Sequence, residues 1–139
     1  MELRTPILAV LAATAALAAA APVLACGDEP MPENLIASPS VKAGLRAAFL
    51  RANAHLSPSQ VGLPVSGRTY YGRAYDMDYA VATFAASGKP TIFGRAGKQG
   101  WRVMRQTHGG VCTDYVPVEL IQTWSLVHWG GRCYVEPSV

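Results

Sequence analysis

The stretch YAVATFA, residues 79–85, decides the fold, because β-branched and aromatic residues fill much of its length and predict a strand. Outward from it, the segments TYYGRA (69–74), TIFGR (91–95) and WRVMRQ (101–106) share its two-residue period. Turn-forming residues separate the four segments, and Asp76-Met77-Asp78 predicts the first turn. Loops this short imply hairpins, so the sequence predicts an antiparallel meander of about four strands.

An amphipathic helix is predicted ahead of the meander, over residues 39–54. Ser38 offers an N-cap oxygen, and Pro39 suits the first helical position. Apolar residues from Val41 to Leu56 then recur at near-helical spacing. We expect this helix to cover one face of the sheet.

A second, shorter helix is predicted to open at Pro117 and to stop at Gly130-Gly131, with an apolar side that includes Trp124 and Val127. Residues 132–135 (RCYV) then predict a last short strand. The expected fold is therefore α+β: an N-terminal amphipathic helix packed on an antiparallel meander, a short second helix and a disulfide-stapled C-terminal tail. This architecture is similar to that of cystatin-like folds, as an analogy of layers only.

The first 25 residues have the composition of a signal peptide. Arg4 and the N-terminal amine precede an uncharged run, Pro6 to Ala25, that is rich in alanine and leucine. A transmembrane helix is disfavoured, because it needs roughly 20 strongly apolar residues and this run consists mainly of weakly apolar alanine. The sequence therefore predicts export with removal of residues 1–25.

Val23-Leu24-Ala25-Cys26 resembles a bacterial lipobox, in which the cysteine is diacylated on sulfur after cleavage of the leader. The resemblance implies a lipid anchor at Cys26, on the outer face of the membrane. Residues 26–38 would then form a flexible, lipid-anchored spacer, and residues 39–139 a single domain. The alternative is plain secretion, with Cys26 left as a free or disulfide-bonded thiol.

Cys112 and Cys133 are the other two of the three cysteines. In an oxidising compartment an even pair is more plausible as a disulfide than as reactive thiols. One cysteine for the lipid and two for a bridge leave no odd thiol.

A family resemblance accompanies these motifs. The order YAVATF, FGR, WRV and then a cysteine followed by VPVELIQTW, all between Tyr70 and Trp124, resembles a group of uncharacterised secreted proteins and lipoproteins of high-GC Gram-positive bacteria. The resemblance implies a small domain in the cell envelope and brings no activity with it. The matched positions are nearly all structural in type: Tyr79, Phe84, Phe93, Trp101, Cys112, Pro117 and Trp124.

Charge and motif content narrow the classes of function. The net charge of +3 is a mild excess rather than the concentrated basic stripe of a nucleic-acid-binding protein, so no nucleic-acid partner is expected. Arg68, Tyr70, Tyr71 and Arg73 are interpreted as an edge strand whose arginines prevent pairing with other chains. The sequence contains no nucleophile elbow and no phosphate-binding loop.

His108, Asp114 and His128 are the candidate functional residues. A metal site that includes Cys112, or a Cys–His nucleophile, is disfavoured because a bridged cysteine offers no thiolate. No metal or other cofactor is expected.

The leading hypothesis is a membrane-tethered, non-enzymatic domain that binds a protein or small molecule of the cell envelope. The alternatives are a small hydrolase-like enzyme that uses these three residues, and an inhibitor of secreted proteases with hairpin tips aligned on one edge.

Overall fold

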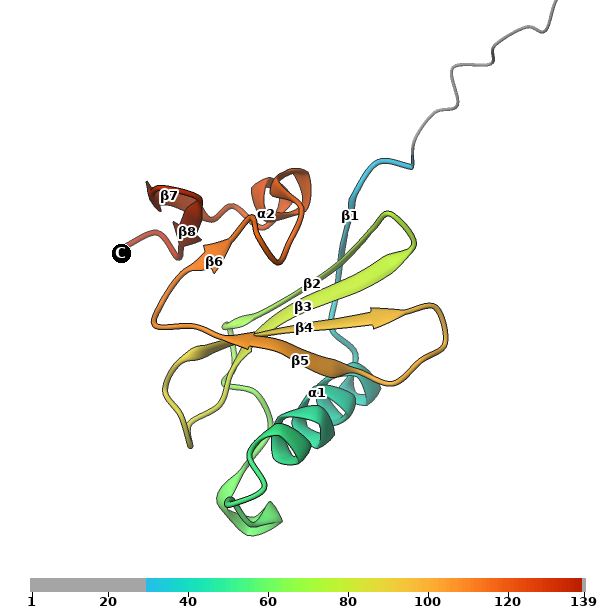
Figure 1. Ribbon diagram of the computed structural model, residues 1–139, viewed down its shortest axis with the longest axis vertical. Coiled ribbons are helices and arrows are strands. Elements are labelled where there is room, and N and C mark those ends of the chain that lie inside the picture. Colours follow the sequence, from blue (N-terminus) through green and yellow to red (C-terminus); the bar gives the residue numbers. More distant parts are fainter. Residues whose placement is uncertain (1–29, 139) are drawn as a thin grey trace, which may run out of the picture.

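The computed structural model describes residues 30–138, and a five-stranded antiparallel sheet is its main element (Figure 1). The strands follow the order β1 (Glu33–Leu35), β2 (Thr69–Ala74), β3 (Met77–Thr83), β4 (Pro90–Ala96) and β5 (Arg102–Gln106). The α+β class and the antiparallel sheet are thus confirmed. The predicted signal peptide, residues 1–25, and Cys26 lie outside the described residues.

Strand β3 is buried almost throughout because both faces of the sheet are covered. Its residues alternate between two apolar clusters, with Ala80 and Ala82 in one and Tyr79 and Val81 in the other. A strand with two covered faces has no solvent-facing row, which explains the nearly continuous apolar composition of YAVATFA.

The first hairpin turn is tighter than the sequence predicted. Tyr75 and Asp76 alone form it, with φ angles of 50° and 61°, as expected of a two-residue turn that matches the twist of its strands. Met77 and Asp78 belong to β3, where Asp78 lies opposite Arg73. The prediction of Asp76-Met77-Asp78 as the turn is therefore wrong: aspartate favours turns, but here Asp78 pairs with arginines on the neighbouring strands.

The end of the predicted spacer is a strand. Glu33–Leu35, within the residues expected to form the spacer, forms β1 and pairs with β2. Strand β2 is consequently an interior strand, and its interpretation as a free edge is wrong. Gly72 permits this packing, since a Cβ at this position would lie 2.5 Å from the carbonyl oxygen of Glu33 and 2.5 Å from Leu120 Cδ1.

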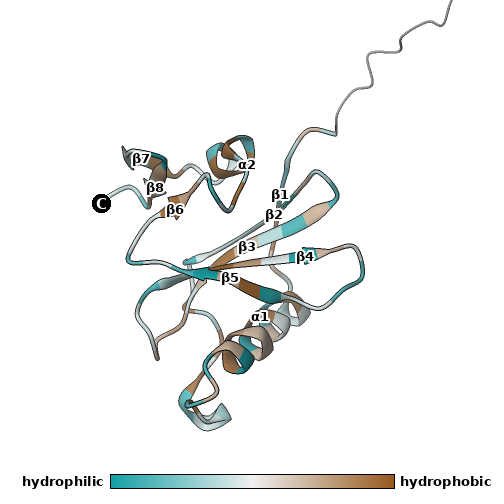
Figure 2. Ribbon diagram, in the orientation of Figure 1, coloured by the Kyte–Doolittle hydropathy of each residue, from teal (hydrophilic) through white to brown (hydrophobic). Residues whose placement is uncertain are grey.

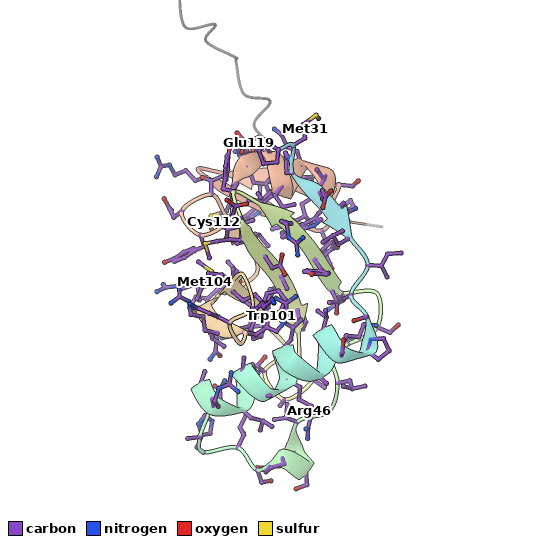
Figure 3. The ribbon with its side chains drawn as sticks, turned by 90° about the vertical axis from the view of Figure 1, so that its right-hand side faces the viewer. Met31, Arg46, Trp101, Met104, Cys112 and Glu119 are labelled. Carbon is purple, nitrogen blue, oxygen red and sulfur yellow. A yellow bond between two sulfur atoms is a disulfide. The ribbon has the colours of Figure 1, made fainter. Side chains whose placement is uncertain are left out.

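Helix α1 (Pro39–Ala52) covers one face of the sheet, and the single 3₁₀ turn η1 (Pro58–Gln60) follows it. Ser38 is the N-cap, as predicted, with its hydroxyl accepting from the Val41 amide at 3.3 Å. Leu45 and Phe49 point into the core, and apolar and polar residues alternate along the helix in Figure 2. Trp101 lies between α1 and the sheet (Figure 3) and touches the helix at Gly44.

Among residues 30–138 no helix has the length and apolarity that a membrane span requires.

The opposite face carries helix α2 (Val118–Thr123) and a small second sheet in the order β6-β8-β7. Its strands are β6 (Val111–Cys112), β7 (Val127–Gly130) and β8 (Cys133–Val135). The second helix thus starts close to Pro117 as predicted but ends at Thr123, seven residues before Gly130-Gly131. Val127 continues the helical spacing in the sequence, yet in the structure it pairs across strands with Val135.

The predicted disulfide is confirmed. Cys112 and Cys133 are direct partners in the β6–β8 pairing, and a bond joins their sulfur atoms. Their Cα atoms lie 4.0 Å apart, slightly less than the usual separation of about 4.4–6.8 Å. The bridge holds the last strand against β6 and thereby fixes the path of the C-terminal tail.

Candidate ligand-binding cleft

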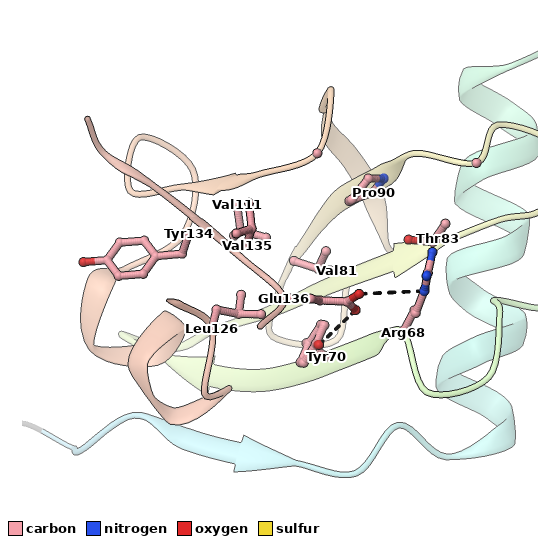
Figure 4. A pocket seen from close by; sticks show the side chains of 12 residues that line it. Arg68, Tyr70, Val81, Thr83, Pro90, Val111, Leu126, Tyr134, Val135 and Glu136 are labelled. Atoms are coloured by element: carbon pink, nitrogen blue, oxygen red, sulfur yellow. Dashed lines mark hydrogen bonds and ion pairs between the residues drawn. The ribbon is translucent and has the colours of Figure 1, made fainter. Parts of the chain in front are cut away.

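A cleft of about 270 Å³ lies between the main sheet and the C-terminal segment (Figure 4). Strands β2, β3 and β4 form one side, and the segment that continues from β8 forms the other. The interior is lined by apolar side chains from both sheets, Val81, Pro90, Val111 and Val135, and by Leu126, which precedes β7. The cleft therefore exists only because the tail folds back over the sheet.

The polar side chains of the cleft gather at one end. The Tyr70 hydroxyl donates to Glu136 Oε1 at 3.0 Å, and Arg68 Nε lies 3.7 Å from Glu136 Oε2 (Figure 4). The side chains of Arg68 and Glu136 are 57% and 41% exposed, so this pair stands at the mouth. An ion pair with this exposure contributes about 0–1 kcal/mol, which a ligand can readily replace.

Tyr70 is the most perturbed group of the cleft. The pKa of Tyr70 is raised to about 12, mainly by burial. The hydrogen bond to Glu136 and the negative charge of that carboxylate raise the pKa further, and the positive charge of Arg68 lowers it by a smaller amount. The phenol therefore stays protonated throughout the physiological range. In the cleft it serves as a hydrogen-bond donor and is poorly suited to act as a base.

Strand alternation explains how Tyr70 reaches the cleft. Tyr70 lies on the α2 side of β2 and packs 5.9 Å from the Trp124 ring, whereas Tyr71 lies on the α1 side. The Trp124 indole in turn donates to the Tyr71 carbonyl at 3.3 Å, which holds α2 against the sheet. In the sequence, Arg68 and Tyr70 indicated only an edge strand, and no pattern around Glu136 marked it as functional.

The three predicted functional residues do not form one cluster. His108 and Asp114 line a separate hollow of about 360 Å³, formed by the end of β5, the loop after it and the small sheet. His128 is not part of its lining: its ring packs 5.4 Å from Tyr134, and its Nε2 lies 3.0 Å from the Gly131 carbonyl oxygen. Within residues 30–138, no three histidine, cysteine, aspartate or glutamate side chains are grouped closely enough to hold a metal ion.

The two residues in the hollow already contact basic side chains. Asp114 Oδ1 accepts from Arg132 at 2.6 Å, and His108 Nδ1 lies 3.4 Å from Lys89 Nζ. Asp114 is thus oriented by a cation rather than by a histidine. A hydrolase that uses His108, Asp114 and His128 together would require His128 to leave its contacts with Tyr134 and Gly131.

A second polar cluster lies inside the main sheet, on the α1 side. Asp78 is 4% exposed and accepts from Tyr71 Oη at 3.2 Å, Arg73 Nε at 2.7 Å and Arg95 Nε at 2.8 Å. Burial by itself raises the pKa of Asp78, but the hydrogen bonds and charges of the two arginines outweigh it and hold this pKa below its ordinary value. Arg95 also lies over the Trp101 ring at 4.6 Å. Both carboxylate oxygens are engaged, so the cluster joins three strands and serves the fold.

The cleft is therefore the place where apolar volume and polar groups combine in the manner of a ligand site. Comparison of the chain with protein-family models, with curated proteins and with solved structures gave no match.

Proposed function

We propose that this protein is an exported, non-enzymatic binding domain, tethered by a lipid at Cys26 to the outer face of the membrane, and that the cleft holds a small amphipathic ligand of the cell envelope. The observation that carries the proposal is that one cleft, of about 270 Å³ in all, has apolar side chains along its interior and polar groups at one end. Pockets that bind small molecules combine mostly apolar walls with a few polar groups that set the orientation of the ligand.

The polar end favours a ligand with a hydrogen-bond acceptor as its head. Arg68 and Tyr70 offer donors, while the one carboxylate, Glu136, accepts from Tyr70 and forms an ion pair with Arg68. A ligand carboxylate can take the place of Glu136 against these donors, with its apolar body beside Val81 and Leu126. We therefore expect a medium-chain carboxylate to bind better than the matched amine.

Binding rather than catalysis is favoured by the state of the polar groups. A catalytic base works best with a pKa near the operating pH, whereas the pKa of Tyr70 is raised to about 12. The inhibitor hypothesis gains no separate support. The β2–β3 and β4–β5 turns lie at the same end of the sheet (Figure 1), but every antiparallel meander places alternate turns in this way.

The test is a titration of the mature, leader-free chain with octanoate and with octylamine, followed by two-dimensional ¹⁵N–¹H NMR. Octanoate should shift the amide signals of the cleft lining, and the Arg68→Ala variant should weaken this binding. Arg102→Ala is the matched control, because Arg102 is also an exposed arginine, at the start of β5 and outside the lining of the cleft. Glu136→Gln should strengthen octanoate binding, since it removes the charge that competes for the donors. Shifts scattered over the whole surface, or equal losses in the two arginine variants, would refute the cleft as the binding site.

The tether is tested separately in the producing cell. The wild-type protein should partition into detergent and carry diacylglycerol on Cys26 by intact mass, and Cys26→Ala should appear in the aqueous phase. A leader-free wild-type product with an unmodified Cys26 would refute the anchor and leave plain secretion.

A further inference from the structure

The side chain of Trp129 is exposed to solvent, although the packing of the fold does not require an exposed tryptophan at this position. Its side chain is 74% exposed, whereas Trp101 and Trp124 are 4% and 5% exposed. It lies on β7, an outer strand of the small sheet, between His128, which pairs with Tyr134, and Gly130, which pairs with Cys133. Trp129 is thus the extra residue of a β-bulge. Bulges redirect a side chain at some cost to the pairing, and they are common beside functional sites.

The redirected indole borders the hollow of about 360 Å³ that also holds His108 and Asp114. Tyr115 and Arg105 complete its polar and aromatic lining, with the Arg105 guanidinium 5.9 Å from the Tyr115 ring centre. The Cys112–Cys133 disulfide forms part of the wall. The hollow therefore combines two aromatic rings with an imidazole, a guanidinium and a carboxylate on a covalently fixed base.

This combination matches the chemistry of a sugar ring. The C–H faces of a pyranose stack on an aromatic ring, and its hydroxyl groups both donate and accept hydrogen bonds. Asp114 offers acceptors and Arg105 offers planar donors, on the same hollow as the indole. A protein partner would usually pack aliphatic side chains around such a tryptophan, and the residues that line this hollow include no leucine, isoleucine, valine or methionine.

Charge selects among sugars. Lys89 lies beside His108, Arg105 lines the hollow, and Arg132 balances the one acid, Asp114. The cations exceed the carboxylates, so the hollow attracts an anionic group of a ligand and repels a cationic one. We propose that this hollow binds an acidic sugar unit of a glycan, with its ring stacked on Trp129 and its carboxylate toward Arg105. The proposal concerns a second site and does not depend on the ligand of the cleft.

The experiment uses trigalacturonic acid as the probe and maltotriose as the neutral control, with the mature chain. Trp129 is the one exposed tryptophan of the three, so quenching of tryptophan fluorescence by acrylamide reports mainly on it. Trigalacturonic acid should protect the fluorescence, and maltotriose should do so only at higher concentration. Added salt should reduce the difference between the two sugars.

Variants distinguish a binding role from a structural one. Trp129→Ala should lower the affinity for trigalacturonic acid at least about tenfold by calorimetry, because stacking on the indole is lost. Arg105→Ala should abolish the preference for the acidic sugar while binding of maltotriose persists. Tyr75→Ala is the control, since Tyr75 is another exposed aromatic residue, 55% exposed, on the β2–β3 turn. The thermal midpoint of each variant should match that of the wild type, because these side chains lie at the surface.

Three results would overturn the proposal. One is an absence of protection by either sugar, and another is unchanged affinity in Trp129→Ala. The third is protection of Trp129 that grows with protein concentration in the absence of sugar, together with a dimer in sedimentation. That result would assign the exposed indole to contact between copies of the chain.

Discussion

The buried carboxylate of Asp78 offers the sharpest test of how this sheet is held together. Asp78→Asn keeps the shape of the side chain and removes its charge. The amide nitrogen would then face an arginine donor, and the partly buried Arg95, 27% exposed, would lose its counter-charge. We therefore expect a substantial loss of stability without a change of fold.

The size of the expected loss of stability depends on the groups that contact Asp78, which differ in their exposure to water. Arg73 is 53% exposed and can turn to water, so its share is small. Hydrogen bonds from Arg95 and Tyr71 to a buried charge contribute about 1.5–3 kcal/mol. The expected loss in the free energy of unfolding is about 2–4 kcal/mol, which corresponds to a decrease of about 10–20 °C in the thermal midpoint of a domain of this size.

The assay is urea unfolding of the wild type, Asp78→Asn and Asp76→Asn, followed by circular dichroism. Asp76→Asn makes the same charge change two residues away, at a turn position with φ of 61° that asparagine tolerates, and should be nearly neutral. Equal midpoints for the two variants, or a loss below about 0.5 kcal/mol for Asp78→Asn, would refute the reasoning.

Asp78→Asn also tests a predicted dependence of the stability on pH. Because the folded-state pKa of Asp78 is lowered, its contribution is fully present above its unfolded-state pKa of about 3.9 and is lost as the pH falls through the folded-state value. The stability of the wild type should therefore decline below about pH 4, and Asp78→Asn should lack part of this decline. An identical acid dependence in both proteins would show that Asp78 does not titrate as inferred.

Three further predictions test the packing, the bridge and the cleft. Gly72→Ala should cost about 1–3 kcal/mol in urea unfolding, because a Cβ there meets the β1 backbone and α2, whereas Gly62→Ala, which meets nothing within 4 Å, should be close to neutral. Reduction of the Cys112–Cys133 disulfide, whose sequence separation is 21, should cost about 3 kcal/mol, and an unchanged unfolding midpoint under reducing conditions would contradict this. In spectrophotometric titration Tyr70 should ionise near pH 12, and Tyr70→Phe should remove the contribution of one tyrosine from that part of the curve.

The elements that depend on local preferences were predictable from the sequence. The two-residue period of residues 69–106 predicted strands β2 to β5, and Ser38 with Pro39 predicted the start of α1 within the observed bounds. The cysteine count, with Cys26 assigned to a lipid anchor, predicted the pairing of Cys112 with Cys133. These inferences succeed because hairpin turns, helix caps and the count of thiols require only neighbouring residues or the composition.

The tertiary structure alone decided the pairing of distant segments and therefore both candidate sites. A strand as short as β1 has no recognisable period, and its register depends on the carbonyl and amide groups that β2 presents to it. The polar end of the cleft joins Tyr70 to Glu136, 66 positions apart, only because the disulfide-fixed tail returns over the sheet. The bulge at Trp129 likewise arises from a mismatch in the pairing of β7 with β8, which no single segment encodes.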